Sequence, residues 1–350
     1  MATISDPKPH SFPKCGQSSC EESALSFSKV CWSHADPDRY LSDLRQSIAR
    51  SDRNIPLALN LKKVECEGLD LSHLNLRDSF LSQTKMSRCL FIGADLSEAS
   101  LIGANFTRCD FVGTDLAKAN LTRATFTHCS FSYADLRGAQ LTESIFRDTD
   151  LMGAMLWRVN LWNADISGAA HLKKKNFYHP SKPADADRAR LSESEPLMAL
   201  ESYRNVKHYF YGKGLVEDAG WAAYRELTME RKHFYRTKDS RYIPSLLMDL
   251  LSGYTEKPNR AILSSIGIIF FFGIFYYWVG AVRPVLDPQT PVGLWDNIYF
   301  SIMTFTTVGF GDFVPKPMGW VRILVCLEAF TGPFMAGLYI FTLTRKYSAH

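Results

Sequence analysis

An apolar residue returns at every fifth position from Leu61 to Ile166, and this spacing limits the fold more than any other feature of the chain. The 22 positions hold only Leu, Phe, Met, Ile and Cys, and no insertion breaks the register. The residue two places earlier is usually small, as at Ala94, Ala99 and Ala104. A helix repeats its apolar face about every 3.6 residues and a strand every two, so neither explains the pattern. A period of five with one large and one small inward residue predicts a four-sided solenoid.

Residues that lie 20 positions apart share their side-chain type, which predicts a coil of 20 residues. One face carries a leucine ladder from Leu61 to Leu161, and another carries phenylalanines. The 22 repeats then give about five and a half coils, or about 26 Å at the spacing of neighbouring strands. The same spacing separates three cysteines, which we expect to be core thiols rather than metal ligands: Cys89, Cys109 and Cys129.

The stretch "GADLSEASLIGANF" resembles the pentapeptide-repeat family, whose repeat is A-[DN]-L-x-x. The resemblance implies a right-handed quadrilateral β-helix over residues 58–170. Some members of that family mimic DNA, but residues 61–166 hold 13 acids and 11 bases, which is close to neutral. The whole chain has a formal net charge of only +4, which argues against nucleic-acid binding driven by charge. We expect a rigid cytosolic platform, open to an unknown cytosolic partner.

Two stretches near the C-terminus are long and apolar enough to span a membrane. Residues 261–282 contain no charge, and residues 323–344 contain a single charged group, Glu328. A helix of 22 residues spans about 33 Å, which exceeds a hydrocarbon core of about 30 Å. Basic residues before the first stretch and after the second place both termini in the cytosol. No signal peptide opens the chain, and a plasma membrane, most simply a bacterial inner membrane, is expected.

A short helix over residues 293–305 is expected between the two spans, and "TTVGFGD" follows it at residues 306–312. Irregular backbone at membrane depth is tolerated only where protein or a water-filled path surrounds it. Alternating glycines let successive carbonyl oxygens point toward one axis, where they replace the hydration shell of a cation. The short helix directs the negative end of its dipole toward the same place, which favours a cation there.

This segment resembles the potassium-channel signature TVGYG, with Phe310 in place of Tyr, and the resemblance covers residues 261–344. It implies a homotetramer in membrane lipid that conducts K⁺. The implied ion-conducting filter is Thr307, Val308, Gly309, Phe310 and Gly311. The implied filter supports are Asp312, Thr306, Tyr299, Trp295 and Glu328. Phe310 lacks the hydroxyl that usually ties the filter to the surrounding aromatic residues.

Two features of the second span leave alternatives open. An acid inside a membrane segment is a functional hypothesis by default, so Glu328 either supports the filter or lies near the outer interface. Gly332, Pro333 and Gly337 interrupt the span and form either a gating hinge or a surface for close helix packing.

The residues before the solenoid contain a Cys/His cluster. Cys15, Cys20, Cys31 and His34 are spaced C-x4-C-x10-C-x2-H, which suits a structural zinc ion; free cysteines in a disordered tail are the alternative. Similar clusters are familiar ahead of some pentapeptide repeats. We assign residues 1–35 to this cluster and residues 36–57 to a helix that caps the first coil. Residues 171–195 are expected to be a linker.

Residues 196–258 are expected to form a cytosolic helical hairpin and an interfacial helix, which precede the pore at residues 259–346. The predicted architecture is thus multidomain, with a β-helix joined to an α-helical membrane pore. The predicted function is passive, potassium-selective conduction, with regulation from the N-terminal side. A nonselective cation channel and a membrane-anchored scaffold with a vestigial pore are the alternatives. We find no nucleophile–base pair or phosphate loop in a suitable context, so no enzyme is expected. The sequence names no gating stimulus.

Overall fold

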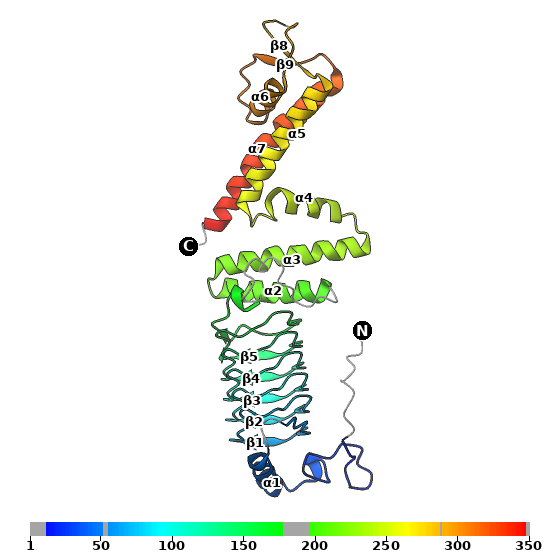
Figure 1. Ribbon diagram of the computed structural model, residues 1–350, viewed down its shortest axis with the longest axis vertical. Coiled ribbons are helices and arrows are strands. Elements are labelled where there is room, and N and C mark those ends of the chain that lie inside the picture. The colour runs from blue at the N-terminus through cyan, green and yellow to red at the C-terminus, as the bar shows by residue number, and fades with distance from the viewer. Residues whose placement is uncertain (1–11, 52–54, 178–195, 288, 348–350) are drawn as a thin grey trace. The chain divides into compact units, whose positions relative to one another are not determined.

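The computed structural model describes residues 12–51, 55–177, 196–287 and 289–347. The chain divides into two compact units, Met1–Glu230 and Arg231–His350, and the boundary falls inside helix α3 (Val216–Thr237). The first unit is built around the solenoid, and the second contains both apolar spans (Figure 1). Most of the expected linker, residues 178–195, lies outside the described residues.

The solenoid is a stack of parallel strands, each 20 residues from the next. Register pairs such as Phe106 with Phe126 extend through the whole sheet, and they confirm the predicted coil length. Isolated bridges at Asn60, Asp70 and Asn75 add the other sides of each coil, which is therefore four-sided. The sheet, visible in Figure 1, consists in order of β1 (Glu65–Glu67), β2 (Lys85–Ser87), β3 (Asn105–Thr107), β4 (Thr125–Thr127) and β5 (Ile145–Arg147). A further pair, β6 (Thr149–Asp150) with β7 (Ala169–Ala170), closes the last coil.

The inward residues form one continuous core. Phe111 is fully buried, and its ring stacks between Phe91 and Phe131 at centroid distances of 4.6 and 4.7 Å. The cysteine column lies in the same core: the thiols of Cys109 and Cys129 each donate to backbone carbonyls at 3.4–3.6 Å. These thiols are hydrogen-bonded core groups, as the sequence predicted.

The corners of the coils place residues in the left-handed backbone region. Every fifth residue from Lys63 to Asn163 has a positive φ, and most of these residues are not glycine. Each corner residue follows an inward residue by two positions, so the corner and core periods are the same. A non-glycine residue in this region costs about 1–2 kcal/mol, which the backbone ladder and the core must offset at every corner.

The N-terminal edge of the solenoid is covered by two elements. Helix α1 (Pro37–Arg50) begins with Asp36 as its cap and buries Tyr40 and Leu44 in the solenoid core. The loop before it pairs with Asn60, whose backbone N–H and side-chain amide donate to Ser26 Oγ at 2.7 Å and to the carbonyl of Ala24 at 2.7 Å. A short 3₁₀ turn, η1 (Trp32–His34), links the loop to α1.

The opposite edge is covered by helix α2 (Pro196–Gly212) and a 3₁₀ turn, η2 (Lys174–Phe177). Leu161 donates its N–H to Ser202 Oγ at 3.0 Å, and the amide of Asn205 donates back to the Leu161 carbonyl at 3.0 Å. The Tyr209 hydroxyl donates to the carbonyl of Ala169 at 3.0 Å. The helical hairpin of α2 and the first part of α3 therefore closes the β-helix, a role that the sequence analysis did not assign to it.

The second unit contains α4 (Tyr242–Ser252), α5 (Pro258–Val279), α6 (Leu294–Phe305) and α7 (Gly319–Tyr347). Two helices, Pro258–Val279 and Gly319–Thr344, are long and apolar enough to cross a membrane. The first ends three residues earlier than expected, because Gly280 is left-handed (φ 62°) and the chain enters a strand, β8 (Val282–Pro284). This strand pairs antiparallel with β9 (Phe313–Pro315).

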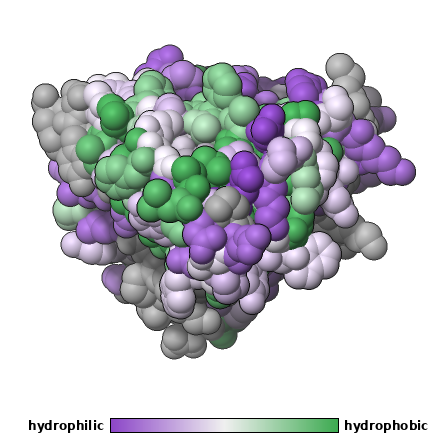
Figure 2. Space-filling model, turned by 90° about the horizontal axis from the view of Figure 1, so that it is seen from above, coloured by the Kyte–Doolittle hydropathy of each residue, from purple (hydrophilic) through white to green (hydrophobic). Residues whose placement is uncertain are grey.

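Large apolar side chains remain exposed on both spans, among them Leu263, Trp278 and Phe330. Figure 2 shows apolar surface (green) side by side with polar surface (purple) on the face that it presents. Exposed large apolar side chains along two long helices are typical of contacts with other proteins or with a membrane.

The stacked core makes a specific prediction for Phe111→Ala. Removing the ring between Phe91 and Phe131 leaves a cavity in a core that cannot collapse, and the change should destabilise the solenoid by about 3–5 kcal/mol. Arg147→Ala, on the exposed side of β5, is the control and should stay within about 0.5 kcal/mol of the parent. Calorimetric melting of the purified protein measures both; equal transitions would contradict the proposed core.

Candidate pore and metal-binding sites

Helix α6 lies between the two spans and ends at the glycine-rich segment. Its first turn is fixed by the Asp296 carboxylate, which accepts from the N–H of Gly293 at 2.8 Å. Its apolar face packs on α5, where the ring of Phe300 meets that of Tyr276 at 5.7 Å. The negative end of the helix dipole therefore lies next to Thr306 and Thr307.

Two glycines bring the spans into direct contact with this short helix. A Cβ added at Gly273 of α5 would lie 2.8 Å from the Cα of Ile298. A Cβ added at Gly332 of α7 would lie 1.7 Å from the carbonyl oxygen of Phe305. Because a real Cβ essentially never approaches a backbone atom so closely, only glycine allows α7 to reach the C-terminal end of α6.

A buried hydrogen-bonded group joins the three helices. Glu328 of α7 is fully buried, and its Oε2 accepts from the Tyr276 hydroxyl of α5 at 2.7 Å. Its Oε1 contacts the hydroxyl of Ser301 in α6. The Ser301 hydroxyl also lies 2.9 Å from the carbonyl of Ile269 in α5. Glu328 is therefore buried between α5, α6 and α7 and is not at a solvent-exposed interface of the chain.

The five residues of the expected filter follow α6 and are exposed in the single chain. Thr307, Gly309 and Gly311 have positive φ values of 56°, 54° and 81°. Val308 and Phe310, which lie between them, do not. The sign of φ thus alternates along the segment. Nothing lies within 4 Å of a Cβ added at either glycine.

The expected supporting residues fall into two groups. Tyr299 is half-buried; its hydroxyl interacts with the Asp312 carboxylate, and its ring meets Phe313 edge-on at 6.0 Å. Asp312 also accepts through its backbone carbonyl from the N–H of Val285 at 2.9 Å. Trp295 and Thr306 are exposed in the single chain, and the Thr306 hydroxyl donates within its own helix.

The three expected hinge residues differ in their surroundings. Gly332 is buried in the contact with Phe305, which assigns it a packing role. Pro333 and Gly337 are exposed, and nothing lies within 4 Å of a Cβ added at Gly337. Helix α7 continues through Pro333 without a break, so a hinge at Pro333 and Gly337 stays a prediction.

A buried aspartate connects the helices that precede the pore. Asp249 of α4 receives an ion pair from Arg231 of α3 and another from Arg260 of α5 at 2.6 Å. Arg260 also donates to the Asp249 backbone carbonyl at 2.9 Å. Both arginines thus hold one carboxylate, which ties α4 to the end of α3 and to the start of the first span.

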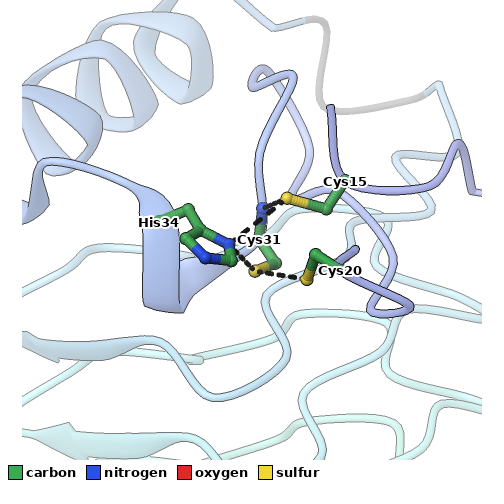
Figure 3. A group of neighbouring side chains, drawn as sticks. All are labelled: Cys15, Cys20, Cys31 and His34. Atoms are coloured by element: carbon green, nitrogen blue, oxygen red, sulfur yellow. Dashed lines mark hydrogen bonds between the residues drawn. The ribbon is translucent and has the colours of Figure 1, made fainter. Parts of the chain in front are cut away.

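The four residues of the expected metal site come together in the N-terminal loop (Figure 3). Their ligand atoms all lie within 4.8 Å of one another. The Nδ1 atom of His34 is 3.5 Å from Cys15 Sγ and 3.3 Å from Cys31 Sγ, and the sulfurs of Cys20 and Cys31 are 3.7 Å apart. Around tetrahedral zinc these separations are about 3.6 Å for sulfur to nitrogen and about 3.8 Å for sulfur to sulfur, so the donor set fits the ion.

The two buried thiols of this cluster have opposite pKa shifts. Backbone N–H groups of Cys31 and Gln17 point at the Cys15 sulfur and lower the pKa of that thiol to about 6, which favours the thiolate that zinc binds. Burial, together with the neighbouring thiols, raises the pKa of Cys31 to about 11. A bound cation favours the deprotonated form of each thiol, including Cys31.

Sequence reasoning missed Tyr276, Ser301 and Asp249. Tyr276 and Ser301 are 52 and 27 residues from Glu328, and each sits in an apolar run where no repeat or motif marks it. The only available signal was chemical: an acid in a membrane span needs hydroxyl or cationic partners. Asp249 was hidden in the apolar stretch "SLLMDLLSGY".

Comparison with known proteins finds two families in the chain. Residues 265–349 match a family profile described as "Ion channel". Residues 70–108, 119–158 and 134–169 match pentapeptide repeats, in eight copies. Among curated proteins, two-pore potassium channel 1 of Arabidopsis thaliana is 32% identical over 81 residues, which are 23% of this chain. The match spans 22% of that channel, about a fifth of its length.

Pentapeptide-repeat proteins are found among the solved structures that match part of the chain. One from the thylakoid lumen of Arabidopsis thaliana is 16% identical, with a TM-score of 0.23, over 41% of this chain and 87% of its own. A plasmid-mediated fluoroquinolone resistance protein is 26% identical, also with a TM-score of 0.23, over 34% of this chain and 64% of its own.

The glycine contact predicts different outcomes for two neighbouring substitutions. Gly332→Ala forces α7 away from the Phe305 carbonyl and should destabilise the second unit by about 1–3 kcal/mol or more. Gly337→Ala, in the same helix with open space around it, should be neutral or slightly stabilising, because alanine favours the helix. Thermal unfolding of both variants in one detergent measures the difference. Similar melting temperatures would mean that α7 does not pack on α6 through Gly332.

Proposed function

We propose that this chain, which joins pentapeptide repeats to a C-terminal ion-channel region, forms a potassium-selective pore. Conduction is passive and runs down the ion gradient, without covalent chemistry. The observation that carries the proposal is the alternating backbone from Thr307 to Gly311, directly after a helix that is held between two spans. An alternating sign of φ lets successive carbonyl oxygens point toward the same side, which is what a dehydrated cation requires.

Four copies around an axis complete the pore, because a single chain supplies one row of carbonyls. Exposure of the filter residues and of large apolar side chains on both spans supports this assembly, since neighbouring copies and lipid then cover them. The basic residues that flank the spans favour cytosolic termini, in a plasma membrane such as the bacterial inner membrane.

Regulation, in this proposal, enters through the cytosolic residues that precede the pore. Asp249 supports that route, because it bonds both to Arg231 before α4 and to Arg260 at the start of α5. A cytosolic partner of the solenoid would act by changing the position of these helices. The stimulus itself is not specified by any residue that we identify.

The loop cluster, we infer, holds a structural zinc ion through Cys15, Cys20, Cys31 and His34. Four protein ligands leave no open position for catalysis. The same loop hydrogen-bonds the first coil through Ser26 and Asn60, so the ion would order the cap of the N-terminal edge.

Ion competition in proteoliposomes tests the pore. We expect the purified protein to conduct potassium, and we expect excess sodium neither to carry the flux nor to block it. The flux should be lost in Gly309→Ala and in Gly311→Ala. Both glycines have positive φ values, 54° and 81°, which alanine adopts at a cost of about 1–2 kcal/mol per residue, and the carbonyls would turn away from the axis.

Gly319→Ala is the matched control, because its surroundings are open and its φ is not positive. Equal sodium and potassium flux would favour a nonselective cation channel, in line with the missing hydroxyl at Phe310. A well-assembled protein that never conducts would favour a membrane-anchored scaffold. Normal potassium flux in either filter variant would exclude this filter.

Zinc is tested by metal analysis and by melting. The protein purified without added metal should contain one zinc ion per chain, a ratio that Cys20→Ser should abolish. Stripping the ion should lower the melting temperature of the solenoid, because the loop would lose its order and release its bonds to Asn60. Ser28→Ala, in the same loop but outside the ligand set, is the control. Protein that contains no zinc and melts unchanged after chelation would contradict the assignment.

A further inference from the structure

The buried group around Glu328 contains more hydrogen-bond acceptors than hydroxyl hydrogens. Three side chains and one carbonyl meet there: Glu328, Tyr276, Ser301 and the backbone oxygen of Ile269. Tyr276 and Ser301 bring one hydroxyl hydrogen each, and the carbonyl of Ile269 can only accept. Each of the three close oxygen–oxygen contacts needs one hydrogen to be a hydrogen bond, and the two hydroxyl groups supply only two hydrogens.

An ionised Glu328 would leave one of these contacts without a hydrogen. The Tyr276 hydroxyl donates to Oε2, and the Ser301 hydroxyl would then have to serve both Oε1 and the Ile269 carbonyl. Two acceptor oxygens in close contact without a hydrogen between them repel each other, which is unfavourable in a buried site. A protonated Glu328 supplies the third hydrogen: its Oε1–H donates to the Ser301 hydroxyl, and the Ser301 hydroxyl donates to the Ile269 carbonyl.

The surroundings favour the same protonation state. Glu328, Tyr276 and Ser301 are all fully buried, and among the described residues no Lys, Arg or His forms an ion pair with Glu328. An isolated carboxylate in an apolar interior carries a desolvation penalty of several kcal/mol. The hydroxyl partners do not supply the opposite charge that would offset it.

We infer that Glu328 is a neutral carboxylic acid that positions the pore helix by donating a hydrogen bond to Ser301. Two hydrogen bonds in sequence then link the three helices, from Glu328 of α7 to Ser301 of α6 and from Ser301 to the Ile269 carbonyl of α5. Ser301 lies six residues before Thr307 on the helix that leads into the proposed filter. Glu328 is then a positioning residue and contributes no negative charge that attracts permeant cations.

The inference rests on the proposed function only for its effect on conduction, and an infrared measurement tests it separately. The full-length protein in liposomes should show the carbonyl stretch of a protonated carboxyl group at neutral pH. The Glu328→Gln variant should lack that band, so the band should appear in the spectrum of the parent minus that of the variant. If the difference spectrum instead contains carboxylate bands, Glu328 is ionised and the inference is wrong, whether or not the protein conducts.

Potassium flux supplies the second readout. Glutamine has the shape of the protonated acid: its amide N–H can donate to Ser301 and its oxygen can accept from Tyr276. Glu328→Gln should therefore keep flux near that of the parent, whereas Glu328→Ala and Ser301→Ala should lower it by about tenfold, as the loss of a buried partner predicts. Flux in Glu328→Gln as low as in Glu328→Ala would show that the negative charge is needed.

Ser265→Ala is the matched control for the serine variant. Ser265 lies in α5, and its hydroxyl donates to the carbonyl of Ala261 within that helix at 2.8 Å. Its removal should leave flux unchanged. Equal losses in Ser265→Ala and Ser301→Ala would mean that removing any serine hydroxyl from this unit has the same effect, which would contradict a specific role for Ser301.

Discussion

Each coil of the solenoid can satisfy its backbone only through a neighbouring coil, and the rest of the first unit depends on this constraint. Strands pair in parallel at a spacing of 20 residues, so interior coils are complete on both sides. The first and last coils each leave an open edge that must be covered. The Cys/His loop with α1 covers one edge, and α2 covers the other. The two ends of the repetitive solenoid are thus covered by segments that lack the five-residue period.

In the second unit, too, one element is held in place by its neighbours, here the two apolar spans. Helix α6 is short and could not keep its place by its own hydrogen bonds alone. Backbone contact at Gly273 and Gly332 fixes its distance from the spans, and the hydroxyl and carboxyl groups of Ser301 and Glu328 fix its rotation.

The sequence predicted what repeats, and of the elements that close the solenoid it predicted the helix within residues 36–57 but not the role of α2. The period of five and the ladder of 20 gave the coil, its register and the burial of Phe111 and Cys109, because each position is supported by several copies of itself. Single polar residues such as Ser202, or Ser301 beside Glu328, act once and across long separations, so no pattern announces them. The Cys/His cluster was predicted from ligand chemistry, which needs no repeat.

The left-handed corner at every fifth residue also has a consequence for how such a chain can change its length. Losing five residues would keep every inward side chain inward, but it would rotate all later faces by a quarter turn against the earlier ones. The leucine and phenylalanine ladders would then no longer match, and the last edge would present different carbonyls to α2. Only steps of 20 residues preserve both ladders and ends, so length in this scaffold varies by whole coils.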